Sequence, residues 1–243
     1  MASEDLGAGE SPADPGSEAR PSGYRCGDVL LPVWPDGQEV KIYCGGVVAL
    51  TRFADTAHYH QRLVEKVLAM ESSDSHARHY FRGAGCIKVY DLPAWGIPEA
   101  ELLHARALEM FRRVLKTPKA EADVCWANIF RDGDFIMPHS HTRSSESIVY
   151  FLSGGAEDRD NPLSGRFSVV DPRLQECCKE QKGRMTTPWL PPQAPGVMIM
   201  FPADVLHFVN PHRGEQPRIS VAWNISEDKL PGEPIPGGRG PAV

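Results

Sequence analysis

The chain has 243 residues, a formal net charge of −6, 41% hydrophobic and 24% charged residues, which is the balance of an ordinary globular domain. The acidic charge argues against a nucleic-acid partner, because phosphate contacts need clustered Lys and Arg. No apolar run approaches the roughly 20 residues that span a bilayer, and residues 1–22 lack the features of a signal peptide, so we expect a cytoplasmic protein with no membrane partner.

Both ends of the chain have the composition of disordered segments. Residues 1–26 are rich in Gly, Ser, Ala and Pro, and residues 231–243 are dominated by Gly and Pro. Such segments cannot bury enough apolar surface to offset the entropy of an ordered chain. We therefore predict an N-terminal tail over residues 1–26, a single folded domain over residues 27–230, and a flexible C-terminal tail over residues 231–243.

The first half of this domain predicts two helices. Between Ala57 and Met70, apolar residues recur at helical spacing. The second helix, from Pro98 to about Leu115, has the stronger signals. Proline suits the first helical position, Glu99 and Glu101 favour the positive N-terminal end, and basic residues occupy the last turn.

From Asp123 onward the pattern changes to short β-like runs broken by turn residues. The predicted strands are Val124–Phe130, Phe135–Met137, Ile148–Leu152, Arg166–Val170, Met185–Trp189, Val197–Phe201, Leu206–Val209 and Arg218–Ile225. Eight short strands after two helices are typical of a sandwich or barrel with helices on one face. We predict a mainly β fold with flanking helices around a double-stranded β-helix, or jelly roll.

Three histidines in the β-rich half form a candidate metal site. His139 and His141 stand two residues apart at the end of a predicted strand, so both side chains point to one face. His207 lies in an apolar segment, where an unpaired imidazole is costly and a metal would be its partner. Imidazole suits iron, and an oxygen-activating iron requires open positions beside its protein ligands. For His139 and His141 alone, a chance pair of surface histidines is the competing interpretation.

The last predicted strand offers a site for a carboxylate. Alternation places Arg218 and Ser220 on one face of this strand, together with Ala222 and Asn224. A guanidinium can bind a carboxylate through two hydrogen bonds, and the serine hydroxyl can add a third. The alternative is an edge strand whose polar face meets water, and the neighbouring histidines favour the binding site.

Taken in order, these segments resemble the iron(II)/2-oxoglutarate-dependent oxygenases, in particular their small prolyl-hydroxylase-like group. The resemblance covers roughly residues 27–228. It rests on Trp126-Ala127-Asn128, Gly133-Asp134, Pro138-His139-Ser140-His141, the run from Ser147 to Leu152, Asp171-Pro172-Arg173, Phe201-Pro202, His207 and Arg218-Ile219-Ser220.

The resemblance implies a jelly roll that binds Fe(II) through His139 and His207, with 2-oxoglutarate chelating the metal and O2 as the oxidant. The residues implied to bind the co-substrate are Arg218, Ser220, Tyr150 and Asn128. The implied activity is a dioxygenase that oxidises, by default hydroxylates, its substrate through an iron(IV)-oxo species. The implied substrate is a small molecule or a carrier- or peptide-bound group. The sequence is also compatible with a homodimer.

The chain departs from the family at one position, because His141 stands where most members have Asp or Glu. Three interpretations are open. The metal is bound by three histidines, or a carboxylate arrives from Glu146 or Asp204, or the third position is left open, as in halogenases of the superfamily. We favour three histidines, because spacing of two residues places His141 where the carboxylate would be.

Two other functions fit parts of the pattern. A cupin-type dioxygenase uses three histidines without 2-oxoglutarate, but it leaves Arg218 and Ser220 without a ligand. A non-catalytic jelly roll could bind a metal or another ligand without turnover. The charged segments Ala156–Pro162 and Leu174–Gly183 could lie where a substrate enters.

Overall fold

The computed structural model describes residues 21–43, 48–71, 78–81, 84–141, 143–155, 160–174, 177 and 188–232. The first half contains β1 (Gly23–Cys26), β2 (Val29–Pro32), β3 (Lys41–Tyr43), β4 (Val48–Arg52), α1 (His60–Glu71), β5 (Arg78–Phe81), β6 (Ala84–Tyr90) and α2 (Pro98–Leu115). The second half contains β7 (Glu121–Phe130), β8 (Ile136–His139), β9 (Glu146–Gly154), β10 (Phe167–Val170), β11 (Val197–Pro202), β12 (Leu206–Val209) and β13 (Arg218–Ser226).

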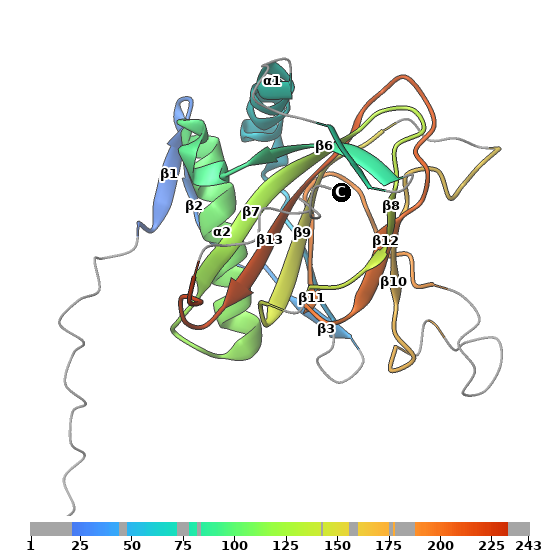
Figure 1. The fold of residues 1–243 in the computed structure, drawn as a ribbon. Coiled ribbons are helices and arrows are strands. Elements are labelled where there is room, and N and C mark those ends of the chain that lie inside the picture. The colour runs from blue at the N-terminus through green and yellow to red at the C-terminus, as the bar shows by residue number, and fades with distance from the viewer. Residues whose placement is uncertain are drawn as a thin grey trace, which may run out of the picture.

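Two antiparallel sheets face each other and form the jelly roll that the sequence predicts. The larger sheet has the order β3-β4-β11-β9-β13-β7-β6-β5, and the smaller one has the order β10-β12-β8. In Figure 1 the smaller sheet lies across one face of the larger sheet, while α1, α2 and the β1–β2 hairpin lie on the other side. The prediction of a mainly β fold with flanking helices is confirmed.

The helix α2 forms where the sequence signals place it. Pro98 occupies the first turn after the extended Ile97, and Lys116 ends the helix in a left-handed conformation. Its apolar side is buried against the large sheet at Leu102, Leu103, Ala107, Met110 and Phe111. The helix α1 begins a few residues later than predicted, because Thr56–His58 forms a separate 3-10 turn.

Alternation along the central strands divides the interior into two cores. In β13, Ile219, Val221 and Trp223 pack toward the helices, whereas Ala222 packs between the two sheets. Both faces of β13 are therefore covered, and all nine of its residues are buried. This strand lies between β7 and β9, so the alternative of an edge strand with a solvated polar face is excluded.

The strands of the first half were not predicted. Gly23–Cys26 pairs in register with Val29–Pro32 and buries Cys26, so the ordered chain begins before the predicted tail boundary at residue 26. The rest of the predicted tails, residues 1–20 and 233–243, lies outside the described residues. Of the predicted strand Met185–Trp189, the described part includes Trp189, which bridges to Val169 of β10.

The charged segments Ala156–Pro162 and Leu174–Gly183 also lie largely outside the described residues. Within the described ranges, neither helix is both long and apolar enough to cross a bilayer.

Candidate metal centre and ligand pocket

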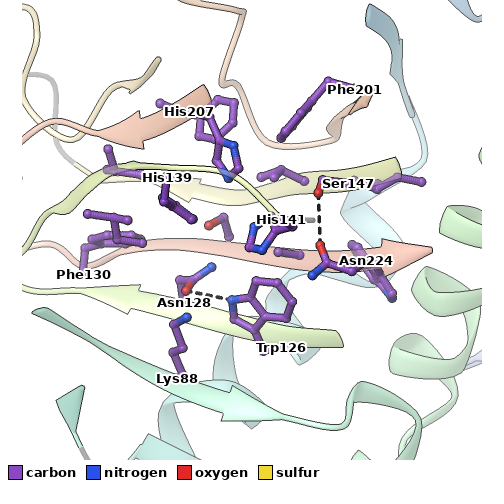
Figure 2. Close-up of a pocket in the computed structure, with 18 residues that line it drawn as sticks. Lys88, Trp126, Asn128, Phe130, His139, His141, Ser147, Phe201, His207 and Asn224 are labelled. Carbon is purple, nitrogen blue, oxygen red and sulfur yellow. Dashed lines mark hydrogen bonds between the residues drawn. The ribbon is translucent and has the colours of Figure 1, made fainter. Parts of the chain in front are cut away.

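A pocket between the two sheets holds the three predicted metal ligands. Its large-sheet wall comes from β6, β7, β9, β11 and β13, and its small-sheet wall comes from β8, β10 and β12. The polar side chains in this wall are Lys88, Asn128, His139, His141, Ser147, His207, Ser220 and Asn224. Figure 2 shows the three imidazoles grouped on one side of the pocket, opposite Asn128 and Lys88.

Strand pairing brings the histidines together. His139 of β8 pairs directly with His207 of β12, so two residues distant in sequence become cross-strand neighbours. His141 follows the end of β8, and its backbone N–H donates to the carbonyl of Ala203 at 2.6 Å. The three ring centroids lie 4.3, 5.1 and 5.2 Å apart, and one nitrogen of each ring lies within 4.8 Å of the others.

Backbone contacts orient two of the rings for metal binding. His139 Nδ1 donates to the carbonyl of Met137 at 2.9 Å, and His207 Nδ1 donates to the carbonyl of Val205 at 2.9 Å. Because a carbonyl can only accept, the proton sits on Nδ1 in each ring and the lone pair of Nε2 is available to a metal. A metal-binding imidazole is commonly held in this way.

The electrostatic surroundings keep the imidazoles in the neutral form that binds metals. Burial lowers the pKa of His139, and it lowers the pKa of His141 to about 4. Burial, followed by the charge of His139, holds the pKa of His207 well below its usual range. These rings would therefore enter metal binding without first losing a proton.

The geometry favours the three-histidine interpretation over a carboxylate from elsewhere. His141 packs edge-on against Trp126, with ring centroids 6.0 Å apart, and lines the same pocket as the other two histidines. Within the described part of the chain, the cluster of potential metal ligands includes neither Glu146 nor Asp204. Three imidazoles on one side of a pocket fit a divalent transition metal and leave its other positions open.

The second predicted feature, Arg218, is a buried cation that forms no ion pair with the residues that the structure describes. Its side chain is 1% exposed and lies over the ring of Phe130, 4.6 Å from the centroid. Arg218 Nη1 donates to Ser220 Oγ at 3.3 Å, whereas Nη2 has no hydrogen-bond partner among the described residues. Burial lowers the pKa of Arg218 to about 9. Ser220 and Phe130 line the pocket, and Arg218 lies directly behind them.

Asn128 lines the same pocket as the three histidines. It is buried in the pocket wall on β7, next to Ser220 in the sheet. Trp126 Nε1 donates to Asn128 Oδ1 at 3.0 Å. Since an indole N–H can only donate, this bond fixes the orientation of the amide. The amide nitrogen then points into the pocket, as Figure 2 shows.

The structure places Tyr150 away from the pocket, contrary to the prediction that it binds the co-substrate. It lies on the helix side of β9, where its hydroxyl is 2.7 Å from the Tyr59 hydroxyl and also contacts His60. Its neighbour Val149 lines the pocket instead. Because successive side chains of a strand point to opposite faces, Tyr150 cannot reach the pocket without a shift of β9, and we do not carry it into the proposed site.

Sequence reasoning missed Lys88 and the pair Ser147–Asn224. Lys88 enters the pocket from β6, where no strand was predicted. The alternation of Ile87 and Val89 with more polar neighbours was the available signal for this strand. Ser147 Oγ donates to Asn224 Oδ1 at 3.0 Å across β9 and β13, a contact that depends on register and not on local sequence.

Comparisons with known proteins agree with this geometry. Residues 124–224 match the model of the family described as "Putative 2OG-Fe(II) oxygenase". No curated protein matches the sequence of the chain. Many solved structures share its fold at low sequence identity.

Three of these structures illustrate the likeness. A prolyl-4-hydroxylase from Pseudomonas putida is 16% identical, with a TM-score of 0.56, over 73% of this chain and 92% of that one. A 2OG-Fe(II) oxygenase family oxidoreductase from Burkholderia pseudomallei is 16% identical, with a TM-score of 0.52, over 76% and 88%. The epimerase SnoN, in complex with Fe3+, alpha ketoglutarate and nogalamycin RO, is 13% identical, with a TM-score of 0.58, over 81% and 89%.

At these identities the structural likeness establishes the fold alone, and the family match adds a likeness in sequence over residues 124–224. The matched residues run from β7 to β13 and include the three histidines, Arg218 and Ser220. The part of the chain between Val124 and Asn224 is therefore similar to the 2OG-Fe(II) oxygenase family.

Proposed function

We propose that this protein is an Fe(II)- and 2-oxoglutarate-dependent oxygenase whose metal is bound by His139, His141 and His207. The supporting observation has two parts. Three convergent neutral imidazoles line a pocket whose wall includes Ser220 and Phe130, and the buried guanidinium of Arg218 contacts both of these residues while its Nη2 has no partner among the described residues. A buried, unpaired charge is strongly unfavourable. A dicarboxylate ligand of the metal would provide the missing partner of Arg218.

Different side chains would bind different parts of the ligands. Arg218 and Ser220 would hold the distal carboxylate of 2-oxoglutarate, and the amide nitrogen of Asn128 would donate a hydrogen bond within the pocket. The rings of Phe130, Phe167 and Phe201 line the pocket and would exclude water from the reacting groups. When bound, the iron supplies oxygen activation, and the protein orients the reactants.

For the outcome we propose hydroxylation of a small molecule or of a carrier- or peptide-bound group, by a protein acting in the cytoplasm. The neighbours in structure include a prolyl-4-hydroxylase and an epimerase. The same fold therefore carries different activities. Hydroxylation is the outcome that requires no further machinery beyond the residues of this pocket.

The test is binding first and turnover second. Without oxygen, protein loaded with Fe(II) should bind 2-oxoglutarate, and the Arg218→Met variant should bind it at least about 100-fold more weakly, since a charge-assisted pair is lost. The matched control is Arg113→Met on the exposed side of α2, which should not change the affinity. With oxygen, the wild type should release succinate from 2-oxoglutarate.

A three-histidine dioxygenase that uses no 2-oxoglutarate is the second candidate, favoured by the cluster of imidazoles without a carboxylate. The same titration separates the two functions. If Fe(II) binds tightly while 2-oxoglutarate shows no saturable binding, the 2-oxoglutarate proposal fails and the second candidate replaces it.

A further inference from the structure

A lysine faces the candidate metal centre from outside the jelly roll proper. Lys88 lies on β6, and its backbone pairs with Asn128 of β7. Its Nζ lies 5.1 Å from the centroid of the Trp126 ring, a cation–π contact that holds the ammonium in the pocket wall. Figure 2 shows this side chain rising from β6 toward Asn128 and the histidines.

Lys88 lines the same pocket as the three histidines. Burial lowers the pKa of Lys88. In the described ranges, none of the ion pairs involves Lys88, and no Asp or Glu lines the pocket.

The charges of the loaded site do not balance under the proposed function. Three neutral histidines leave the two positive charges of Fe(II) uncompensated, where the usual carboxylate ligand would remove one. The two carboxylates of 2-oxoglutarate match the metal in number, and one of them pairs with Arg218. With Arg218 paired in this way, the loaded site as a whole keeps an excess of two positive charges, and none of the described residues that line the pocket is acidic. An anion is missing, and Lys88 is the cation left without one.

We propose that Lys88 is a specificity-determining residue, and that the substrate carries an oxyanion, a carboxylate or a phosphate, which pairs with its ammonium group. The amide nitrogen of Asn128, held by Trp126, lies beside Lys88 and would donate a second hydrogen bond to that oxyanion. This inference rests on the proposed function, because it takes the metal and 2-oxoglutarate as already bound.

The co-substrate is a poor alternative partner for Lys88. Arg218 and Lys88 belong to β13 and β6, which are separated in the sheet by β7. The far carboxylate of 2-oxoglutarate has its partners in Arg218 and Ser220, which already contact each other. Lys88 also differs from a buried cation with a structural role, since Arg106 of α2 forms an ion pair with Asp55.

The experiment uses the whole protein loaded with Mn(II) and 2-oxoglutarate in the absence of oxygen. The probes are benzoate and phenyl phosphate, which match the aromatic wall of the pocket, and benzamide as the neutral counterpart of benzoate. We expect at least one anion to bind about 10-fold or more tightly than benzamide, as a charge-assisted pair requires. Lys88→Met should abolish that preference, Lys88→Arg should retain it, and the exposed Lys41→Met should match the wild type.

The outcomes are distinct. Preference for benzoate identifies a carboxylate substrate, and preference for phenyl phosphate alone identifies a phosphate. Equal binding of the anions and benzamide, or no binding of either anion, overturns the inference. If Lys88→Met instead weakens 2-oxoglutarate binding about 10-fold or more, Lys88 serves the co-substrate and the inference is wrong, while the proposed function stands. If the wild type binds no 2-oxoglutarate, the proposed function itself has failed.

Discussion

Two arginines are fully buried on opposite faces of the large sheet, and their partners differ. On the helix side, Arg106 is 0% exposed and bonds both oxygens of Asp55, at 2.9 and 2.5 Å, and the carbonyls of Pro32 and Val33. On the pocket side, Arg218 is 1% exposed and bonds the hydroxyl of Ser220. Against the effect of burial, Asp55 raises the pKa of Arg106, whereas burial lowers the pKa of Arg218.

The comparison separates a structural cation from a binding cation. A buried guanidinium is stable when the chain itself supplies a carboxylate and further acceptors, as it does for Arg106. Where the described chain supplies a single hydroxyl, as it does for Arg218, an anionic ligand would stabilise the charge under the proposed function. The same reasoning applies to Lys88, because no acidic residue is among the described residues that line the pocket.

The largest expected effect is on stability. Arg106→Met should lower the free energy of unfolding by about 3 kcal/mol, at the lower end of the range for breaking a buried pair, because Asp55 keeps 20% of its side chain exposed. Arg218→Met, in the absence of ligands, should leave stability unchanged or raise it, since an unpaired buried charge is removed. Urea unfolding of both variants measures this. Equal losses of unfolding free energy in the two variants would show that Arg218 has a structural partner. The two arginines would then not differ in role.

The next largest expected effect is on metal affinity. His139→Ala and His207→Ala should each weaken Mn(II) or Fe(II) binding by more than about 100-fold, since losing a ligand exceeds the loss expected for an outer contact. His141→Ala should do the same, while His141→Asp should retain binding, because a carboxylate at this position lowers the charge of the site. Calorimetric titration measures these affinities.

The controls for that titration are Glu146→Gln and Asp204→Asn. A three-histidine site predicts unchanged metal affinity in both variants. A loss in either one, together with normal binding by His141→Ala, would assign the third ligand to that carboxylate.

The sequence predicted the parts of the fold whose signals are local. The limits of α2 follow from Pro98 and its charged ends, and seven of the eight predicted strands match elements of the second half closely. The convergence of His139 and His141 needed only the two-residue period of a strand. By contrast, β6 pairs with β7 across a long separation, and its short apolar alternation resembles that of many loops, so Lys88 went unnoticed.

The face of the sheet to which a side chain points is harder to predict than the location of its strand. Arg218 and Ser220 face inward as alternation requires, and Asn128 joins them because β7 pairs with β13 in register. Tyr150 was misplaced because register decides which of two neighbouring residues on β9 faces the pocket, and a single residue reverses the result. The bulge between Ile219 and Ser220 in the pairing with β9 could not be read from the sequence.

Of the two buried arginines, only Arg218 should contribute to the stabilisation of the protein by 2-oxoglutarate. At about 100 times its dissociation constant, 2-oxoglutarate added to metal-loaded protein should raise the free energy of unfolding by about 2.7 kcal/mol. The Arg218→Met variant should show little of this increase at the same concentration, whereas Arg106→Met should show all of it from its lower starting point. Thermal unfolding with and without ligand provides the measurement, and an equal shift in both variants would place the carboxylate elsewhere.

The smallest expected effect is a loss of stability at acidic pH, through a histidine on the helix side of the large sheet. Trp223 Nε1 donates to His104 Nδ1 at 3.2 Å, which requires a neutral ring, and burial lowers the pKa of His104 to about 4. Between pH 6.5 and 4 the unfolded chain therefore binds a proton that the native protein does not. Stability from this site is complete above pH 6.5 and declines as the pH falls toward 4, by on the order of 2 kcal/mol.

The variant that tests this is His104→Gln, whose amide oxygen can accept from Trp223 without titrating. Its unfolding free energy should fall less than that of the wild type between pH 6.5 and 4, and the exposed His58→Gln should behave as the wild type does. Because pocket histidines that bind a metal lose it in acid, the metal-free protein is the proper sample. Parallel pH profiles for His104→Gln and the wild type would mean that acid acts through groups other than His104.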